Sequence, residues 1–185
     1  MKKVHPAVVG AQPFQLAEHR PVERLFEDAE GRDRLEKSLS RYPEKKGALL
    51  PMLAYAQERN GWLSPEAMEE IAEALDLTPA YVRSVATFYT MYAKRPVGRY
   101  WIQVCTCISC HVNRGEEVFE SFLEHTGTRA GEVSEDGRYT VIEAECLGAC
   151  GFATVVQVND RYFENVTPET VPEVLAQLEP GEPEA

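Results

Sequence analysis

The stretch Cys105-Thr-Cys-Ile-Ser-Cys110, taken with Cys146-Leu-Gly-Ala-Cys150, determines how the rest of the chain is interpreted. The two runs contain all five cysteines of the 185 residues. Each run follows an apolar, β-prone segment, residues 100–104 before the first and residues 139–144 before the second. If these strands are neighbours in one sheet, the loops at their ends bring two pairs of thiols together. Four thiolates in one place are typical ligands of zinc or of an iron–sulphur cluster.

Composition limits the class of protein. The length suits one large domain or two small ones, and 44% hydrophobic residues are enough to bury a core. No run of about 18 apolar residues is present, so we expect no transmembrane helix. His5 and Pro6 interrupt the segment that a signal peptide would need, so we expect none. Without export, the cysteines are expected to be thiols or metal ligands rather than disulfides.

The negative charge is concentrated in the cysteine-containing half of the chain. Residues 1–97 carry 14 basic and 14 acidic residues, whereas residues 98–185 carry 5 basic and 16 acidic residues and account for the net charge of -11. This acidic half argues against nucleic acid as a partner. It fits a small electron carrier that is steered onto a basic surface, and it fits equally well a surface charge that only keeps the chain in solution.

The first half is predicted to be helical. Residues 1–30 contain scattered prolines without a sustained period, and we expect an extended arm there. Residues 31–97 are expected to form a helical bundle. Its four helices are predicted at about residues 32–42, at about 47–59, from Pro65 and from Pro79 to about Ala93. The last of them is apolar around more than half of its circumference, which predicts a place at the centre of the bundle.

Residues 98–178 change to an alternating pattern of strands and helices. Strands are expected at about residues 100–104, 139–144, 154–158 and 161–163, and helices at about 114–125 and 168–178. The first cysteine loop then lies between a strand and a helix, close to the thioredoxin arrangement. Residues 179–185 are expected to be a disordered tail. The predicted fold class is α+β, an N-terminal helical bundle followed by a thioredoxin-like α/β domain.

Spacing alone leaves four interpretations of the cysteines open. A [2Fe–2S] cluster and a structural zinc ion would use the same four ligands, which are Cys105, Cys110, Cys146 and Cys150. A third interpretation makes Cys107 and Cys110 a redox C-x-x-C pair. In the fourth, the thiols are buried and unligated.

Other residues near the cysteines narrow these interpretations. Gly148 and Gly151 favour a ligating second loop, because glycine lets backbone N–H groups approach sulphur closely. His111 is the only histidine in the two runs, and a Rieske site needs two. We find no glycine-rich phosphate loop and no Ser-His-Asp set, so the chain itself offers no evident site for a nucleotide or for bond-making chemistry.

Several motifs together resemble one family. Val104-Cys-Thr-Cys-Ile-Ser-Cys110, Glu145-Cys-Leu-Gly-Ala-Cys150 and Val155-Val-Gln-Val-Asn-Asp160 are similar to the thioredoxin-like [2Fe–2S] subunits in the NADH-dehydrogenase module of respiratory complex I, the NADH–quinone oxidoreductase. Upstream, Ala48-Leu-Leu-Pro-Met-Leu53, Asn60-Gly-Trp-Leu-Ser64 and Val85-Ala-Thr-Phe-Tyr89 resemble the helical N-terminal part of that family. The resemblance spans roughly residues 33–178.

The resemblance implies a function. It implies one [2Fe–2S] cluster that takes single electrons from FMN, held by Cys105, Cys110, Cys146 and Cys150. It implies a partner subunit that binds NADH and FMN, and beside it the large iron–sulphur subunit, in the cytoplasmic peripheral arm of a membrane-bound complex. The chain would then belong to an enzyme only as a subunit, with no NADH or quinone site of its own and no direct membrane insertion. The same module recurs in NAD-linked hydrogenases and formate dehydrogenases.

Two features depart from the family pattern. Relatives usually carry a proline shortly after the last cysteine, whereas Gly151-Phe-Ala-Thr154 contains none. Cys107 is an additional thiol in the first loop. Because Cys105 directly ends a strand whereas Cys107 lies in a loop, we predict that Cys105 is the ligand and that Cys107 is a thiol near the cluster without binding it. The acidic surroundings disfavour a further negative charge, so a low reduction potential is expected.

Overall fold

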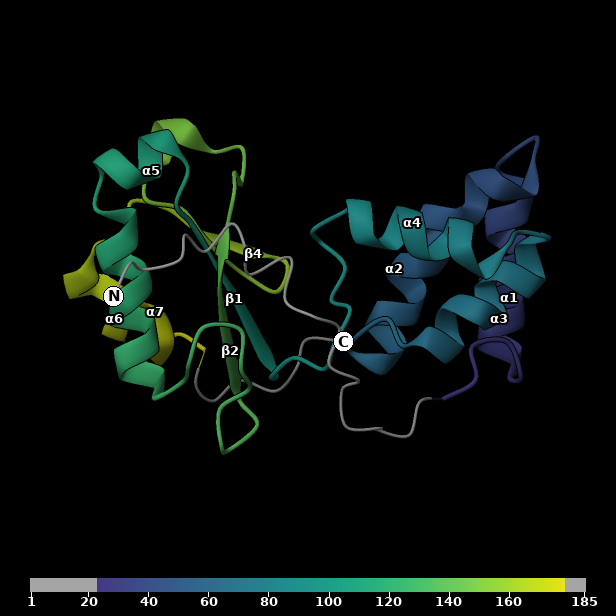
Figure 1. Ribbon diagram of the computed structural model, residues 1–185, viewed down its shortest axis with the longest axis horizontal. Helices are drawn as coiled ribbons and strands as arrows, with labels where there is room; N and C mark the ends of the chain where they lie inside the picture. The colour runs from purple at the N-terminus through teal and green to yellow at the C-terminus, as the bar shows by residue number, and fades with distance from the viewer. Residues whose placement is uncertain (1–22, 179–185) are drawn as a thin grey trace. The chain divides into compact units, whose positions relative to one another are not determined.

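The computed structural model describes residues 23–178 (Figure 1). The chain divides into two compact units, and the boundary falls between Pro96 and Val97. Most of the expected arm at residues 1–30, and the whole expected tail at residues 179–185, lie outside the described residues. Within residues 23–178, no helix is long and apolar enough to span a bilayer.

The first unit is a bundle of helices. Its elements are α1 (Ala29–Ser40), the 3-10 helix η2 (Lys45–Ala48), α2 (Leu49–Asn60), α3 (Pro65–Leu75) and α4 (Pro79–Phe88). The side chains of Ser64 and Thr78 accept N–H groups at the starts of α3 and α4, and a proline occupies the first turn of each. Such caps satisfy N–H groups that a helix start leaves without partners. Both starts lie where the sequence predicts them.

The core of the bundle comes mainly from α2 and α3. Its buried members from these helices are Leu49, Met52, Leu53, Tyr55, Ala56, Ala67, Met68, Ile71, Ala72 and Leu75. From α4 only Val82 and Ala86 are buried, while Tyr81 and Phe88 are 48% and 77% exposed. The prediction that α4 forms the centre of the bundle is therefore wrong, because its aromatic side chains lie on the surface.

Helix α4 also ends at Phe88 rather than near Ala93. The following segment is held by contacts with α2 and with the loop after it. The Tyr92 hydroxyl donates to the carbonyl of Leu50 at 3.0 Å, and the Ala93 N–H donates to the Gln57 side chain at 2.6 Å. These long-range contacts bury Tyr92 and Ala93, and they replace the hydrogen bonds that a longer helix would make.

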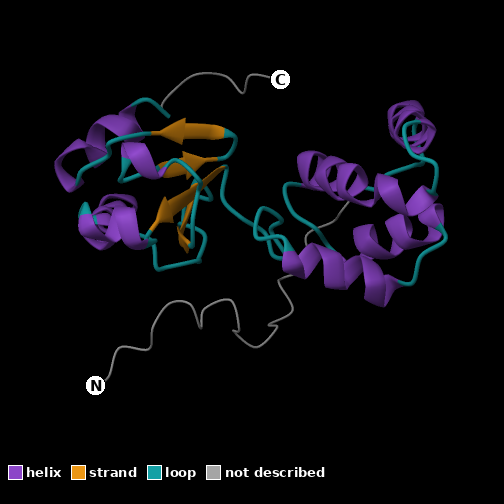
Figure 2. Cartoon of the chain, turned by 90° about the horizontal axis from the view of Figure 1, so that it is seen from above, coloured by secondary structure: helices purple, strands orange, loops and turns teal. Residues whose placement is uncertain are grey.

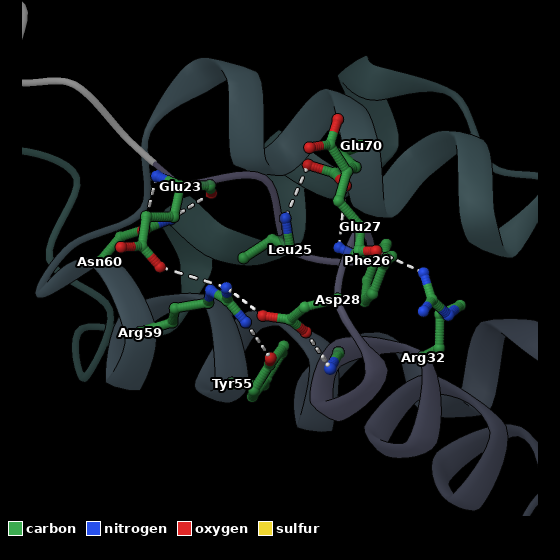
Figure 3. A network of polar contacts seen from close by, with 11 residues as sticks. Glu23, Leu25, Phe26, Glu27, Asp28, Arg32, Tyr55, Arg59, Asn60 and Glu70 are labelled. Atoms are coloured by element: carbon green, nitrogen blue, oxygen red, sulfur yellow. Dashed lines mark hydrogen bonds and ion pairs between the residues drawn. The ribbon is translucent and has the colours of Figure 1, made fainter.

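Residues 23–28 are fastened to the bundle by a polar network (Figure 3). The Glu70 carboxylate accepts the N–H groups of Leu25 and Phe26 at 3.0 and 3.1 Å, and the Leu25 side chain is fully buried. Arg59 of α2 pairs with Asp28, which caps α1 by accepting the Gly31 N–H. This part of the expected arm therefore packs on the bundle.

The second unit is built on a mixed sheet (Figure 2). Its strands are β1 (Tyr100–Cys105), β2 (Tyr139–Ala144), β3 (Val156–Val158) and β4 (Arg161–Phe163), in the order β2-β1-β3-β4. Strand β1 runs parallel to β2 and antiparallel to β3, and β3 runs antiparallel to β4. All four strands were predicted, although β3 begins at Val156 rather than at residue 154.

Helices complete this unit. They are α5 (Ile108–Val112), α6 (Gly115–Thr126), the 3-10 helices η3 (Cys150–Phe152) and η4 (Pro168–Thr170), and α7 (Val171–Ala176). Helix α6 contributes Val118, Phe119 and Phe122 to the core that it shares with the sheet and α7. The sequence did not predict α5, because five residues are too few to show a helical period and both Ile108 and Val112 are exposed.

Candidate metal centre

Strand pairing brings the two cysteine loops together. Strands β1 and β2 are parallel, and Cys105 is in register with Ala144. The loop that contains Cys107 and the loop that begins with Glu145 therefore leave the same end of the sheet, where Figure 1 also shows α5. The Thr106 N–H donates to the Ala144 carbonyl at 3.1 Å, so the parallel pairing continues into the loops.

The first pair of thiols is buried. Cys105 and Cys110 are 3% and 2% exposed, and they pack with Val155 in a small apolar cluster. The pKa of the Cys110 thiol is raised to about 11, mainly by burial and in part by the neighbouring Cys105. Because an uncompensated thiolate would be costly at this place, a positive counter-charge is needed to hold this pair in its ligating form.

The second pair is exposed. Cys146 and Cys150 lie at the surface and interact directly with each other. The N–H of Gly148, whose φ is 80°, together with Cys150 lowers the pKa of Cys146, while Cys146 raises the pKa of Cys150. A left-handed residue at position 148 turns the backbone donor toward the sulphur, which is the role expected of this glycine.

Contacts link the two pairs and define which thiols are neighbours. After Cys146, the nearby Cys105 also raises the pKa of Cys150, and the Ser109 hydroxyl on α5 contacts the Cys150 thiol. Cys107 is half-buried; it contacts Cys146 and also packs against the cluster formed by Cys105, Cys110 and Val155. In residues 23–178, no three or more His, Cys, Asp or Glu side chains surround one point where a single metal ion would sit. His111 lies 3.3 Å from the carboxylate of Glu116.

This donor set fits a binuclear cluster. A [2Fe–2S] cluster takes four cysteine thiolates. The two adjacent pairs of thiols, Cys105 with Cys110 and Cys146 with Cys150, would hold such a cluster here. The ferric ions would supply the positive charge that the buried first pair needs as thiolates.

Three residues near the first cysteine loop were not predicted from the sequence to belong to the site. Ser109 contacts Cys150, and Gly115 packs so closely that an added Cβ would lie 2.9 Å from the carbonyl oxygens of Cys105 and Cys110. The buried Thr154 hydroxyl hydrogen-bonds at the end of α5, and the peptide bond between Ala153 and Thr154 is cis although no proline follows it. The absence of the family's proline was the one sequence signal that pointed to this position.

The fold and the paired thiols define a class of protein, a thioredoxin-like domain with a cysteine-lined metal centre at one end of its sheet. Residues 35–179 match the family model of the thioredoxin-like [2Fe–2S] ferredoxins, and the chain belongs to that family.

Curated relatives agree with this assignment. NADH-quinone oxidoreductase subunit 2 of Thermus thermophilus is 40% identical over 160 residues, which cover 85% of this chain and 87% of the relative. An NADH-quinone oxidoreductase subunit of Rickettsia bellii is 41% identical over 143 residues, with 76% and 86% covered. The like-named subunit of Mycobacterium tuberculosis is 41% identical over 147 residues, which cover 80% of this chain but only 58% of that longer relative.

Solved structures show the same fold. An NAD+-reducing [NiFe]-hydrogenase in the H2-reduced state matches 72% of this chain and 23% of its own, with a TM-score of 0.62 and 21% identity. Together the comparisons confirm the family inferred from the motifs, the α+β thioredoxin-like fold and one [2Fe–2S] cluster as the cofactor. They also confirm the class of function, a subunit of an oxidoreductase.

Proposed function

We propose that this chain is an electron-transfer subunit of an NADH–quinone oxidoreductase and that Cys105, Cys110, Cys146 and Cys150 hold its [2Fe–2S] cluster. The observation that carries the proposal is the meeting of two thiol pairs at one end of the sheet, in a chain whose relatives are such subunits. A bound [2Fe–2S] cluster supplies reversible one-electron transfer.

The two pairs have different tasks in this proposal. Cys105 and Cys110 are buried, so their side of the centre excludes water. Cys105 is held at the end of β1, and Cys110 is held on α5. Cys146 and Cys150 face the surface, so electrons reach the centre from that side. The Gly148 N–H donates to the Cys146 sulphur, and a donor so placed stabilises negative charge on the ligand.

An apolar surface lies beside the exposed pair. It consists of Ile108, Val112 and Phe152, which are 72%, 73% and 51% exposed, and α5 is in contact with η3. Exposed apolar side chains next to a metal centre are typical of a surface that a partner protein covers. We propose that the NADH- and FMN-binding subunit docks here, close enough for electrons to pass directly from its flavin.

The proposal gives each part of the chain a role. Residues 98–178 hold the cluster, while the bundle at residues 31–97 and the arm at residues 1–30 bind partner subunits. On the bundle, the exposed Tyr81, Phe88 and Met91 are candidates for contact with the flavin subunit or the large iron–sulphur subunit. The complex would present this peripheral arm on the cytoplasmic face of the membrane.

Metal analysis of anaerobically purified protein tests the proposed cofactor site. We expect a red-brown protein with iron and acid-labile sulphide near two per chain, as the cluster's composition requires. Zinc in place of iron, without visible absorption, would contradict the proposal and favour a structural zinc module. Cys105→Ser, Cys110→Ser, Cys146→Ser and Cys150→Ser should each lose or strongly alter the visible and EPR spectra.

Co-purification tests the proposed partner. The chain expressed with its flavin subunit should be retained by it, and Ile108→Glu together with Val112→Glu should weaken that retention because both changes place charge in the apolar contact. Ala130→Glu is the control, since Ala130 is an exposed apolar residue in the loop after α6 and lies on neither α5 nor η3. Equal retention of the double variant and the control would mean that the flavin subunit binds at a different surface.

A further inference from the structure

Thr154 stands out among the polar residues near the thiols. Its side chain is 1% exposed, and its Oγ1 donates to the carbonyl of Asn113 at 2.8 Å and lies 3.3 Å from the carbonyl of Cys110. One hydroxyl proton is thus shared between two carbonyl oxygens at the C-terminal end of α5. The bonds join residues that are 41 and 44 positions apart in the sequence.

Helix α5 needs such an external contact. It has five residues, and a helix of that length is not stable on its own hydrogen bonds. Carbonyl groups at a helix end also have no partner within the helix. The Thr154 hydroxyl supplies such a partner from outside to the part-buried carbonyl of Asn113, where an unpaired carbonyl would be costly, and adds a second partner to the Cys110 carbonyl, which already accepts the Asn113 N–H at 3.0 Å.

Thr154 itself is held in place from two sides. Its carbonyl accepts the Val166 N–H at 2.9 Å, and the carbonyl of the next residue, Val155, accepts the Cys105 N–H at 3.0 Å. The hydroxyl is therefore presented from a segment that is already fastened to β1. Movement of α5 against this segment would break the contact with Asn113.

The position of α5 matters to both thiol pairs. Cys110 lies on α5 and belongs to the buried pair, and its neighbour Ser109 contacts Cys150 of the exposed pair. A shift of α5 would move one proposed ligand and the hydrogen-bond donor of another in the same step. The contact made by Thr154 therefore controls the geometry between the pairs as well as within one of them.

We infer that Thr154 is a positioning residue of the metal centre: its hydroxyl fastens the end of α5 and so sets the place of Cys110 and of Ser109. The inference depends on the proposed function, because Cys110 must be a cluster ligand for it to hold. The hydroxyl group of Thr154 positions α5, and the methyl group of the same side chain is dispensable.

Three variants of the full chain test this role. Thr154→Val keeps the shape and loses the hydroxyl, whereas Thr154→Ser keeps the hydroxyl and loses the methyl. Thr140→Val is the matched control, since Thr140 is also 1% exposed and its Oγ1 accepts the Gly98 N–H at 2.8 Å on β2. The readouts are the EPR line shape of the reduced protein, its midpoint potential and the rate at which an iron chelator bleaches it.

Thr154→Val should change the EPR line shape and the potential and should bleach about 2- to 10-fold faster, the range that corresponds to the net worth of one hydrogen bond. Thr154→Ser should match the wild type in all three readouts. Thr140→Val should unfold at lower denaturant concentration but keep the wild-type EPR line shape and potential.

Two results would overturn the inference: a Thr154→Val protein with wild-type line shape, potential and bleaching rate, or a Thr154→Ser protein as altered as Thr154→Val. If Thr154→Val does not fold, Thr154→Ala replaces it, and the inference then requires that only Thr154→Ser keeps the wild-type spectrum. A wild-type chain that binds no [2Fe–2S] cluster would refute the proposed function instead, so the two failures are distinguishable.

Discussion

Replacement of Gly115 by alanine tests whether close backbone packing positions the first cysteine loop. Gly115 is the first residue of α6. A Cβ there would lie 2.9 Å from the carbonyl oxygens of Cys105 and Cys110 and 3.0 Å from the carbonyl carbon of Cys110. These are backbone atoms, so they cannot rotate away as a side chain would, and the end of β1 or α5, which carry the two proposed ligands, must shift.

The size of the effect follows from two opposing terms. Forcing one methyl group into a packed site costs about 1–3 kcal/mol. Alanine is favoured over glycine by about 1 kcal/mol in a helix interior, and less at the first position. We therefore expect Gly115→Ala to lower the free energy of unfolding by about 1–2 kcal/mol, and we expect its [2Fe–2S] chromophore to bleach faster with a chelator.

Gly151→Ala is the control for this experiment. Gly151 directly follows the proposed ligand Cys150. An added Cβ at Gly151 meets no atom within 4 Å, and the φ angle of Gly151 is not positive, so alanine fits there without strain. Its unfolding free energy should stay within about 0.5 kcal/mol of the wild type. Guanidinium unfolding followed by circular dichroism, and bleaching followed in the visible range, measure both effects. Equal behaviour of Gly115→Ala and Gly151→Ala would refute the reasoning.

Three further predictions concern single side chains. Cys107→Ser should keep the visible spectrum and the reduced-state EPR signal, and loss of either would make Cys107 a ligand. Ser109→Ala removes a donor to the Cys150 sulphur, so the midpoint potential should fall by about 20–60 mV in a spectroelectrochemical titration; an unchanged potential would show that the bond is absent from the loaded protein. Asp28→Asn should destabilise the bundle near neutral pH, because hydrogen bonds from Arg59 and the Gly31 N–H lower the pKa of Asp28 from its ordinary value of 3.8. A carboxyl group whose pKa is lowered in the folded state stabilises the fold at pH values above its ordinary pKa, and this stability is lost as the pH falls through the lowered pKa. The free energies of unfolding of Asp28→Asn and wild type should therefore converge in acid. A difference in unfolding free energy that persists in acid would contradict this role of Asp28.

Much of the fold follows from local sequence chemistry. Ser64-Pro65 and Thr78-Pro79 place the starts of α3 and α4 correctly, because an N-cap and a proline in the first turn act within a few residues. The strands that precede the cysteine loops were predicted for a similar reason, since short β-prone runs bounded by turn residues carry their own signal. The candidate ligands followed from their place at the ends of those strands.

Tertiary contacts decided what local chemistry does not determine. Helix α4 ends at Phe88 because Tyr92 and Ala93 bond to residues of α2 that are 42 and 36 positions away. Helix α5 is contacted by the Thr154 hydroxyl, which donates to the carbonyl of Asn113, the residue that follows the helix and lies 41 positions earlier in the sequence.

The difference between local sequence signals and contacts of distant segments also applies to the candidate metal site. The sequence by itself indicated the family, the type of candidate ligand and the end of the sheet where the thiols meet, because these depend on residue type and on strand order. Only the tertiary structure decided that Cys105 and Cys110 are buried while Cys146 and Cys150 are exposed, and that Cys107 contacts Cys146. Burial and pairing depend on which distant segments cover each loop, and no spacing within one loop encodes them.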